Sequence, residues 1–438
     1  MRILTFLASI VLALTITNTF AWRQRAIIEP ARSEILTYNS DSLYIHNDHS
    51  KSLYMVPLNE WTKDPSCDTL YTANYTFPME WLNREVLLRV EYADAPYTVE
   101  LNGEVITSIE DGNTPTEVNI TLATEEDINT VGIRLSPNSE MRKLEGWRAS
   151  NRIGKTPIKG GMILVPAAMT IRDISTRTTS ANGVFNSRIA VALKSYNLND
   201  RRSHLHYKLR TDSGKVVAHG TESLLLRMRG EDTINIATIL PDSTLWSNKN
   251  PELYTLELKL QHEGRYLEYV KQTIGLRKIE IAESGVVMIN DKRVRLKTKE
   301  VGGSITKSQM EELKDEGYNT LHFTAGAHSR DLLNLCDELG LYAIITAPIN
   351  SSRTGDNILV DGNLTNDPEW LTQYMERATR AYHAAKLHPS IVAFAIASES
   401  LNGYNLYEVY LKLKSLERDI PIIYVDNSGE WNSDYVQF

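Results

Sequence analysis

The sequence predicts a multidomain protein in which two β-domains precede an α/β domain. Up to about residue 282, short runs of alternating apolar and polar residues are separated by turn signals, as in β-sandwiches. From about residue 286, strand-like runs alternate with helical ones, which is typical of a parallel sheet. Within that part, Ile391–Ala397 is apolar and free of charge, which suits a strand that is buried on both faces.

Length and composition fit a soluble multidomain protein. The chain has 438 residues, which predicts roughly two to four domains, and it is 42% hydrophobic and 23% charged, so ordinary cores can form. The net charge of -8, without any Lys/Arg-rich run, argues against nucleic acid as a partner. Cys67, Cys336 and the ten histidines show no metal-ligand spacing, so neither a metal nor another cofactor is expected. A disulfide between the two cysteines and a buried free thiol at Cys336 both stay open.

The N-terminus has the three parts of a secretory signal. Arg2 supplies the positive charge, Ile3–Ile16 the apolar core, and Ala21 the small residue before the expected cleavage. The apolar core is too short to span a membrane and no later stretch is long enough, so no membrane span is expected. The sequence therefore predicts that residues 1–21 are removed and that the protein is exported to the periplasm or the extracellular space.

The first β-domain is expected over residues 22–143. Asn102-Gly103 predicts a tight hairpin turn after the strand Tyr97–Leu101. Other expected strands are Leu70–Phe77, Glu85–Tyr92, Glu104–Ile106, Val118–Leu122 and Thr130–Leu135. Such short strands with turn signals predict a sandwich or a jelly roll. Residues 144–168, punctuated by Trp147 and by several Gly and Pro, predict a connector.

The second β-domain is expected over residues 169–282. Its six expected strands are Ile171–Arg177, Ser187–Leu193, His204–Arg210, Thr233–Ala237, Leu253–Leu260 and Tyr266–Ile274. Six strands over about a hundred residues suit an immunoglobulin-like sandwich.

The α/β domain is expected over residues 283–438. Its expected strands are Val294–Lys297, Asn319–Phe323, Leu341–Thr346, Ile391–Ala397, Ile422–Val425 and Tyr435–Phe438, so that the chain stops inside the sixth. Its expected helices are Ser308–Glu316, Arg330–Leu339, Asp367–Leu387 and Tyr404–Leu416. Polar residues at the carboxyl ends of parallel strands face the place where chemistry occurs in barrels, and Glu399 stands at such an end.

The segment His388–Ser400 carries a resemblance to a known family. It reads His-Pro-Ser, then the apolar strand, then Ser398-Glu399, and it resembles the acid/base signature of glycoside hydrolase family 2, the β-galactosidase, β-glucuronidase and β-mannosidase group. Other segments similar to the family are Leu245-Trp246-Ser247, Asn250-Pro251, Leu253–Leu256, Gly275–Ile279, Gly317-Tyr318-Asn319 and Asp367–Trp370.

The resemblance implies three domain types. These are an N-terminal jelly roll of the galactose-binding kind, an immunoglobulin-like sandwich and a (β/α)8 TIM-type barrel. Residues 283–438 are fewer than the roughly 250 of a typical barrel, which predicts an incomplete barrel. A partner chain or a homo-oligomer that completes the sheet, another closure of the sheet, or a truncated gene product would each account for it.

The resemblance also implies retaining hydrolysis of β-glycosides, a reaction that needs two carboxyl groups about 5–5.5 Å apart. Glu399 matches the acid/base position. The family's nucleophile is a Glu after the sixth barrel strand, a position that this sequence does not reach. Ser398 stands where the family has the Asn that holds the sugar 2-hydroxyl, and His322 stands where it has an Arg. These departures predict a degraded active site and, for the chain alone, a pseudoenzyme.

Each candidate residue also has a simpler interpretation. Glu399 is either the acid/base or a solvated residue at the rim of the sheet. His322 is either a substrate-binding residue or a polar strand end. Asp426 and Glu430 form either a substitute carboxylate pair or turn residues in a loop rich in Asn, Ser and Gly. Trp431 is either a platform for a sugar ring or a loop anchor.

Three functional hypotheses follow. The first is an exported β-glycosidase of carbohydrate metabolism that acts through Glu399. The second is a non-catalytic protein that binds glycans through the jelly roll or the remaining cleft. The third is an assembly or scaffold component, or a fragment that a partner chain completes. All three have carbohydrate as the background, and fold likeness alone cannot choose among them, because function depends on the site.

Overall fold

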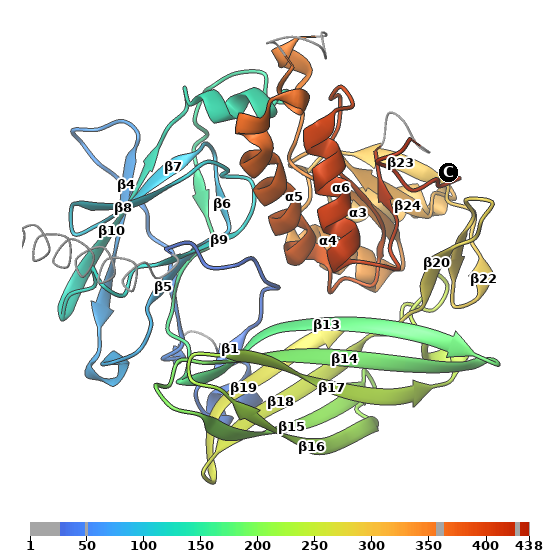
Figure 1. Ribbon diagram of the computed structural model, residues 1–438, viewed down its shortest axis with the longest axis horizontal. Helices are drawn as coiled ribbons and strands as arrows, with labels where there is room; N and C mark the ends of the chain where they lie inside the picture. The colour runs from blue at the N-terminus through green and yellow to red at the C-terminus, as the bar shows by residue number, and fades with distance from the viewer. Residues whose placement is uncertain (1–26, 49–50, 356–362, 425–429, 438) are drawn as a thin grey trace, which may run out of the picture.

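The computed structural model describes residues 27–48, 51–355, 363–424 and 430–437. The expected signal peptide, residues 1–21, and the candidate Asp426 lie outside these ranges. Three units are visible in Figure 1, where the N-terminal β-unit and the α/β unit stand beside each other above the long strands of a sandwich. The predicted multidomain β plus α/β fold is confirmed.

The N-terminal unit packs two antiparallel sheets face to face. One has the order β3-β4-β10-β7-β8 and the other β2-β12-β5-β9, with a short β11-β6 pair beside them. Inward-facing apolar residues such as Val99, Ile133 and Leu88 are fully buried between the sheets. The strands are β2 Met55–Leu58, β3 Thr62–Lys63, β4 Leu70–Phe77, β5 Leu87–Val90, β6 Tyr92–Ala93, β7 Tyr97–Leu101, β8 Glu104–Ile109, β9 Thr116–Asn119, β10 Asp127–Leu135, β11 Ile158–Lys159 and β12 Gly161–Leu164.

The segment 144–168, expected as a connector, supplies part of this unit. Strand β12 lies between β2 and β5 and pairs with both. Ile163 and Val165 are fully buried, so the segment contributes to the core. In the sequence, the adjacent glycines Gly160 and Gly161 indicate a loop, so this short apolar strand is not recognised.

The second unit is a sandwich of seven long strands joined by one short strand from the N-terminal region. Its sheets have the orders β13-β14-β17 and β1-β19-β18-β15-β16. The strands are β1 Thr37–Tyr38, β13 Met169–Ala181, β14 Val184–Ser195, β15 Arg201–Thr211, β16 Val216–Leu226, β17 Glu231–Leu240, β18 Tyr254–His262 and β19 Arg265–Ile274. Six strands were expected here, and β16 is the additional one. It is an edge strand with mostly exposed side chains, so it carries no clear apolar alternation.

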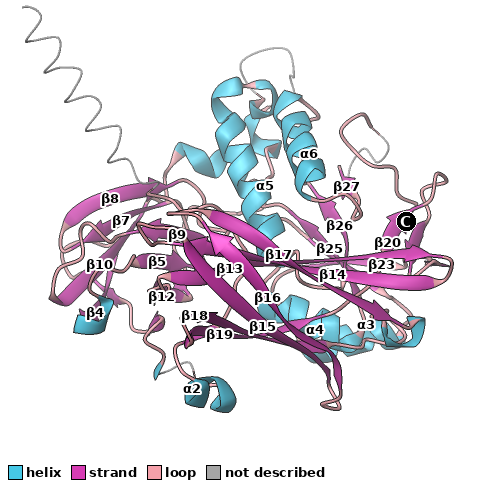
Figure 2. Cartoon of the chain, turned by 60° about the horizontal axis from the view of Figure 1, so that its bottom comes forward, coloured by secondary structure: helices cyan, strands magenta, loops and turns pink. Residues whose placement is uncertain are grey.

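The α/β unit begins with a small antiparallel sheet and continues as five parallel strands in chain order, β23-β24-β25-β26-β27. Helices α5 and α6 pack beside each other (Figure 2). The elements are β20 Ile279–Ile281, β21 Val287–Ile289, β22 Lys292–Arg293, β23 Thr298–Val301, α3 Lys307–Asp315, β24 Thr320–Phe323, α4 Arg330–Leu339, β25 Tyr342–Thr346, α5 Leu371–Ala385, β26 Ile391–Ala395, α6 Tyr404–Leu416 and β27 Ile422–Ile423. Single-turn helices and α2 complete the described structure, at Asp41–His46, Met79–Trp81, Glu140–Leu144, Asp242–Thr244, Ser352–Thr354, Leu364–Asn366 and Pro368–Trp370.

Two strand predictions in this unit are wrong. The first parallel strand is Thr298–Val301 and not Val294–Lys297. Only Val301 of its four residues is buried, and the segment is too polar to be recognised as a strand in the sequence. Tyr435–Gln437 form no strand, so the parallel sheet has five strands in the described part of the chain instead of six. Cys67 and Cys336 are both free, and Cys336 is buried, as the second interpretation expected. No helix among the described residues is long and apolar enough to cross a bilayer.

Candidate functional site

The carboxyl ends of strands β24, β25 and β26 bring the predicted site residues to one edge of the parallel sheet. His322 pairs in register with Ile344, and Thr346 pairs with Ala395. Ser398 and Glu399 follow two residues after the end of β26. Because carboxyl ends of neighbouring parallel strands share one edge, this edge collects polar side chains from several loops.

Glu399 is exposed and has a backbone φ of 39°, in the left-handed region that side chains other than Gly rarely adopt. Hydrogen bonds on both sides hold this turn. The Ser398 amide donates to the Ile349 carbonyl at 2.9 Å, and the Ser351 amide donates to the Ser400 hydroxyl at 3.0 Å. Strained backbone that neighbours impose in this way is often found at functional sites.

The side chain of Asn350 contacts Glu399 directly. Its amide Nδ2 donates to Oε2 of Glu399 at 3.0 Å, while its Oδ1 accepts from the amide and the hydroxyl of Ser352 at 3.1 and 2.7 Å. Asn350 is 2% exposed, so both ends of its carboxamide are fixed. Within the described part of the chain, Glu399 therefore receives a hydrogen bond from a neutral group, and no ion pair reaches it.

The segment 144–148 enters this edge from the N-terminal unit. The backbone N–H of Asn350 donates to the Leu144 carbonyl at 2.8 Å, and the backbone N–H of Gly146 donates to the Asn350 backbone carbonyl at 3.0 Å. A Cβ at Gly146 would lie 2.1 Å from Oδ1 of Asn350, so only Gly allows this approach. The contact fixes the next residue, Trp147, at the same edge.

Trp147 lies over the loop that follows β24. A Cβ at Gly326 would be 3.1 Å from Cζ2 of the indole, so the ring and this glycine are in direct contact. The Trp147 side chain is only half-buried. A half-buried aromatic face suits the apolar face of a sugar ring. In the sequence Trp147 was visible only as a large aromatic residue among Gly and Pro in the expected connector.

His322 points toward the neighbouring strand. Its Nε2 is 2.9 Å from the hydroxyl of Thr346, so it links β24 to β25. This contact fits the interpretation of a polar strand end, and no hydrogen bond or ion pair in the described structure joins His322 to Glu399.

Trp431 and Glu430 belong to the loop after β27. The Trp431 ring is 58% exposed and lies 4.6 Å from the Tyr407 ring of α6, an arrangement that fits a loop anchor. Oε2 of Glu430 accepts a 3.4 Å hydrogen bond from Asn402, which connects this loop to the loop after β26. Only Glu430 of the expected carboxylate pair is described, and its observed partner is an amide rather than Glu399.

The His-Pro-Ser part of the signature has a structural role at the opposite end of β26. Nδ1 of His388 lies 2.6 Å from Oδ2 of Asp337, and the Ser390 amide donates to Oδ1 of the same carboxylate at 3.0 Å. Arg277 donates to the carbonyls of Pro389 and Ile391. The first half of the signature thus fixes where β26 begins, and the second half presents Glu399 where it ends.

The edge can form hydrogen bonds with hydroxyl groups and offers aromatic side chains and carboxylates, among them Trp147 and Glu399. Among the described residues, no group of three His, Cys, Asp or Glu side chains is arranged to hold a metal ion. A retaining glycosidase needs a second carboxyl group about 5–5.5 Å from the first. The hydrogen-bond partner of Glu399 in the described structure is the Asn350 amide.

Two family models match the chain. Residues 291–437 match "Glycosyl hydrolases family 2, TIM barrel domain", and residues 169–277 match "Glycosyl hydrolases family 2". The β-galactosidase of Priestia megaterium is 24% identical over 369 residues, which cover 78% of this chain and 35% of that protein. The β-galactosidase of Lactococcus lactis is 27% identical over 370 residues, which cover 81% and 35%. The chain therefore spans about a third of the length of the curated relatives it matches.

Solved structures with the same fold come from the same group of proteins. A glycosyl hydrolase family 2 member from Bacteroides cellulosilyticus superposes with a TM-score of 0.65 at 16% identity, covering 81% of this chain and 49% of that one. A β-glucuronidase from Bacteroides uniformis gives a TM-score of 0.65 at 15% identity, covering 81% and 46%. At such identities the likeness concerns the fold, and it includes the sandwich and the partial barrel.

Proposed function

This chain belongs to glycoside hydrolase family 2, and we propose that it is an exported protein of carbohydrate metabolism that binds glycans at the Glu399 edge and does not hydrolyse them by itself. The observation that carries the proposal is the neutral partner of Glu399. The carboxylate of Glu399 is held by the Asn350 side-chain amide, and Ser398 and His322 stand where the family has the Asn and the Arg of its active site. One carboxyl group cannot act as both acid and nucleophile in the retaining mechanism.

Glycan binding requires hydrogen-bonding groups and an aromatic face but no pair of catalytic carboxyl groups, and the Glu399 edge offers both of these features. Glu399 and Asn350 offer hydrogen-bonding groups, and Trp147 offers a half-buried aromatic face. Relatives of this chain are β-galactosidases, which supports a β-linked sugar as the ligand. Export is proposed from the signal-like residues 1–21 alone.

The experiment measures hydrolysis and binding on the same protein. The full chain and Glu399→Gln are given a panel of nitrophenyl β-glycosides, and binding of the corresponding unmodified oligosaccharides is followed by calorimetry. We expect no turnover from the folded protein and measurable binding. Glu311→Gln, an exposed change on α3, is the matched control and leaves both results unchanged. Turnover that Glu399→Gln abolishes would overturn the proposal.

A second candidate function is a hydrolase that another chain completes. Two observations favour it. The backbone of Glu399 is still held in a strained conformation, and β27 pairs on one side only in the described sheet. Under this hypothesis Glu399 is the acid/base, and a further polypeptide supplies the nucleophile and more strands. Activity that appears only after a partner is added, and that Glu399→Gln removes, would select this candidate over the first.

A further inference from the structure

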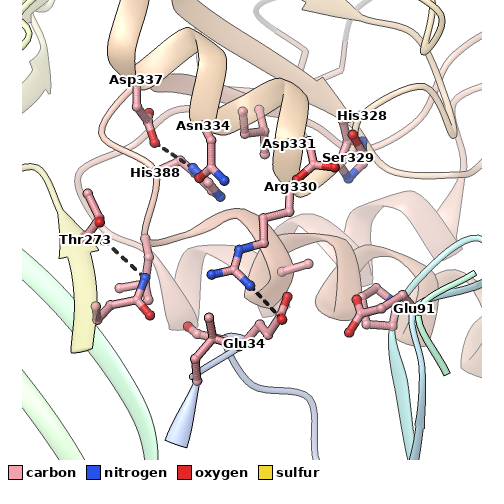
Figure 3. A pocket seen from close by; sticks show the side chains of 18 of the residues that line it. Glu34, Glu91, Thr273, His328, Ser329, Arg330, Asp331, Asn334, Asp337 and His388 are labelled. Carbon is pink, nitrogen blue, oxygen red and sulfur yellow. Dashed lines mark hydrogen bonds and ion pairs between the residues drawn. The ribbon is translucent and has the colours of Figure 1, made fainter. Parts of the chain in front are cut away.

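A cavity of about 790 Å³ lies where the three units meet, away from Glu399. Figure 3 shows it, with α4 residues on one wall and residues of the N-terminal unit and the sandwich on the others. It extends from the loops after β23 and β24 along α4 to the start of β26. Each unit contributes lining residues, including Glu91, Thr273 and Asn334. Its volume is within the range of roughly 300–1,000 Å³ that small-molecule sites occupy.

Several charged groups in the wall form ion pairs with one another or with residues behind it. Nη1 of Arg330 lies 2.6 Å from Oε1 of Glu34, and His388 contacts Asp337 at 2.6 Å (Figure 3). Arg89 forms an ion pair with Glu117 at 2.9 Å and another with Glu91. The lining residues include four Lys or Arg and five Asp or Glu side chains, so the wall has little excess charge to attract an ion. Paired groups still offer donors and acceptors to an uncharged polar ligand.

Two polar groups in the wall lack hydrogen-bond partners within the described structure. Gln272 is 9% exposed, and its Nε2 donates to the Thr273 carbonyl at 3.1 Å, while its Oε1 has no partner. Nδ1 of His328 also has none. Burial lowers the pKa of His328 to about 4, and nearby His388 adds to the shift, so this ring is neutral at pH 7. An unsatisfied buried polar atom is destabilising, and a suitable ligand group would offset that cost.

We propose that this cavity is a second binding site, which takes a neutral, hydroxyl-rich ligand of disaccharide size. Hydroxyl groups both donate and accept, so they can contact the charged groups of the wall, and a rotation of the Gln272 side chain would bring its orphan Oε1 to them. The ligand would touch all three units at once. Its binding would therefore hold the units together and raise the unfolding temperature as its concentration rises.

The test uses the full chain with the double change Ser398→Ala and Glu399→Gln, which alters the site at the sheet edge and leaves in place Trp147, whose ring contacts the lining residue Gly326. Lactose, cellobiose and maltose are titrated by calorimetry, and inorganic phosphate serves as the anionic probe. At least one disaccharide is expected to bind this variant and raise its unfolding temperature, while phosphate has no effect. Adding Gln272→Met is expected to weaken that binding about tenfold, which corresponds to about 1.4 kcal/mol. Glu311→Gln is the control and leaves it unchanged.

A second change guards against a Gln272 variant that fails to fold. Ala384→Trp projects a large side chain into the cavity from α5 and is expected to abolish disaccharide binding without unfolding the protein. If no disaccharide binds the folded double variant, or if binding persists with the cavity filled, the second site does not exist. Phosphate binding that Gln272→Met leaves intact would also overturn the proposal. None of these results depends on whether the Glu399 edge binds glycans.

Discussion

Asn350 donates a hydrogen bond from its side-chain amide to the carboxylate of Glu399 across 3.0 Å. The two residues come from loops after neighbouring parallel strands, and Gly146 of the N-terminal unit packs against Asn350 from the other side. The orientation of the candidate acid therefore depends on a contact between two units. This dependence can be tested without knowing the ligand.

Gly146→Ala is expected to destabilise the protein. Its Cβ would lie 2.1 Å from Oδ1 of Asn350, so the Leu144–Gly146 segment or the Asn350 side chain must move. Overpacking of this kind costs about 1–3 kcal/mol, which urea unfolding can measure. Gly302→Ala is the matched control, because a Cβ there meets nothing within 4 Å. Equal unfolding free energies for the two variants would contradict the close packing of Gly146 on Asn350.

Trp147→Ala is expected to weaken glycan binding at the Glu399 edge roughly tenfold, or about 1.4 kcal/mol. The indole is the half-buried aromatic group that the contact between Gly146 and Asn350 fixes beside this edge. Trp431→Ala serves as the comparison, because one side of its ring packs on Tyr407 at an interplanar angle of 54°. Calorimetric titration with the oligosaccharides of the hydrolysis panel measures the glycan affinity of both variants. A larger loss for Trp431→Ala would restore Trp431 as the sugar platform and displace Trp147.

Elements with local signals were predictable from the sequence. Helices Arg330–Leu339 and Tyr404–Leu416 have the expected bounds. For the first of these the structure gives the reason, since Ser329 caps its start and Gly340 ends it with a φ of 67°. Strands β16 and β23 were not predictable in this way. Both are outer strands of their sheets; β16 has mostly exposed side chains without apolar alternation, and β23 has mostly polar ones.

The candidate site shows the same limit. Glu399 was found because it follows an apolar strand within a signature, which is information local to the sequence. Asn350 and Trp147 were not identified, because their roles come from contacts between the loop after β25, the loop after β24 and a segment of the N-terminal unit. No spacing or period in the sequence records such a contact.

Arg377→Met is expected to destabilise the interface between α5 and the N-terminal unit by about 3–5 kcal/mol. Its guanidinium is fully buried, donates to the carbonyls of Pro348, Glu110 and Met141 at 3.1–3.2 Å, and lies 3.3 Å from the carboxylate of Asp111. Removing it would leave that buried carboxylate without its main cation.

The control for this interface is Arg177→Met, whose exposed pair with Asp419 is expected to contribute less than about 1 kcal/mol. Urea unfolding compares the two variants. Similar small losses of unfolding free energy in the two variants would show that Arg377 does not hold the two units together.

The last prediction concerns Glu268, which is buried in the sandwich with 1% of its surface exposed. Burial raises its pKa from 4.5 to about 7, although Ile171 and Thr170 donate hydrogen bonds to its carboxyl oxygens at 2.6 and 2.7 Å. The folded protein therefore retains a proton between pH 4.5 and about 7 that the unfolded chain has released. The contribution of this group to stability is fully present below pH 4.5 and is lost as the pH rises through about 7.

Glu268→Gln stays neutral at every pH and can form both hydrogen bonds, because the Thr170 hydroxyl can accept as well as donate. The free energy of unfolding of this variant, relative to the unmodified protein, is expected to rise by on the order of 3 kcal/mol between pH 5 and pH 8. Glu222→Gln, an exposed change on edge strand β16, should show no such rise. Urea unfolding of the three proteins at both pH values gives the comparison. A difference between Glu268→Gln and the unmodified protein that is the same at pH 5 and pH 8 would mean that Glu268 is ionised in the fold throughout this range, with its two donors outweighing the cost of burial.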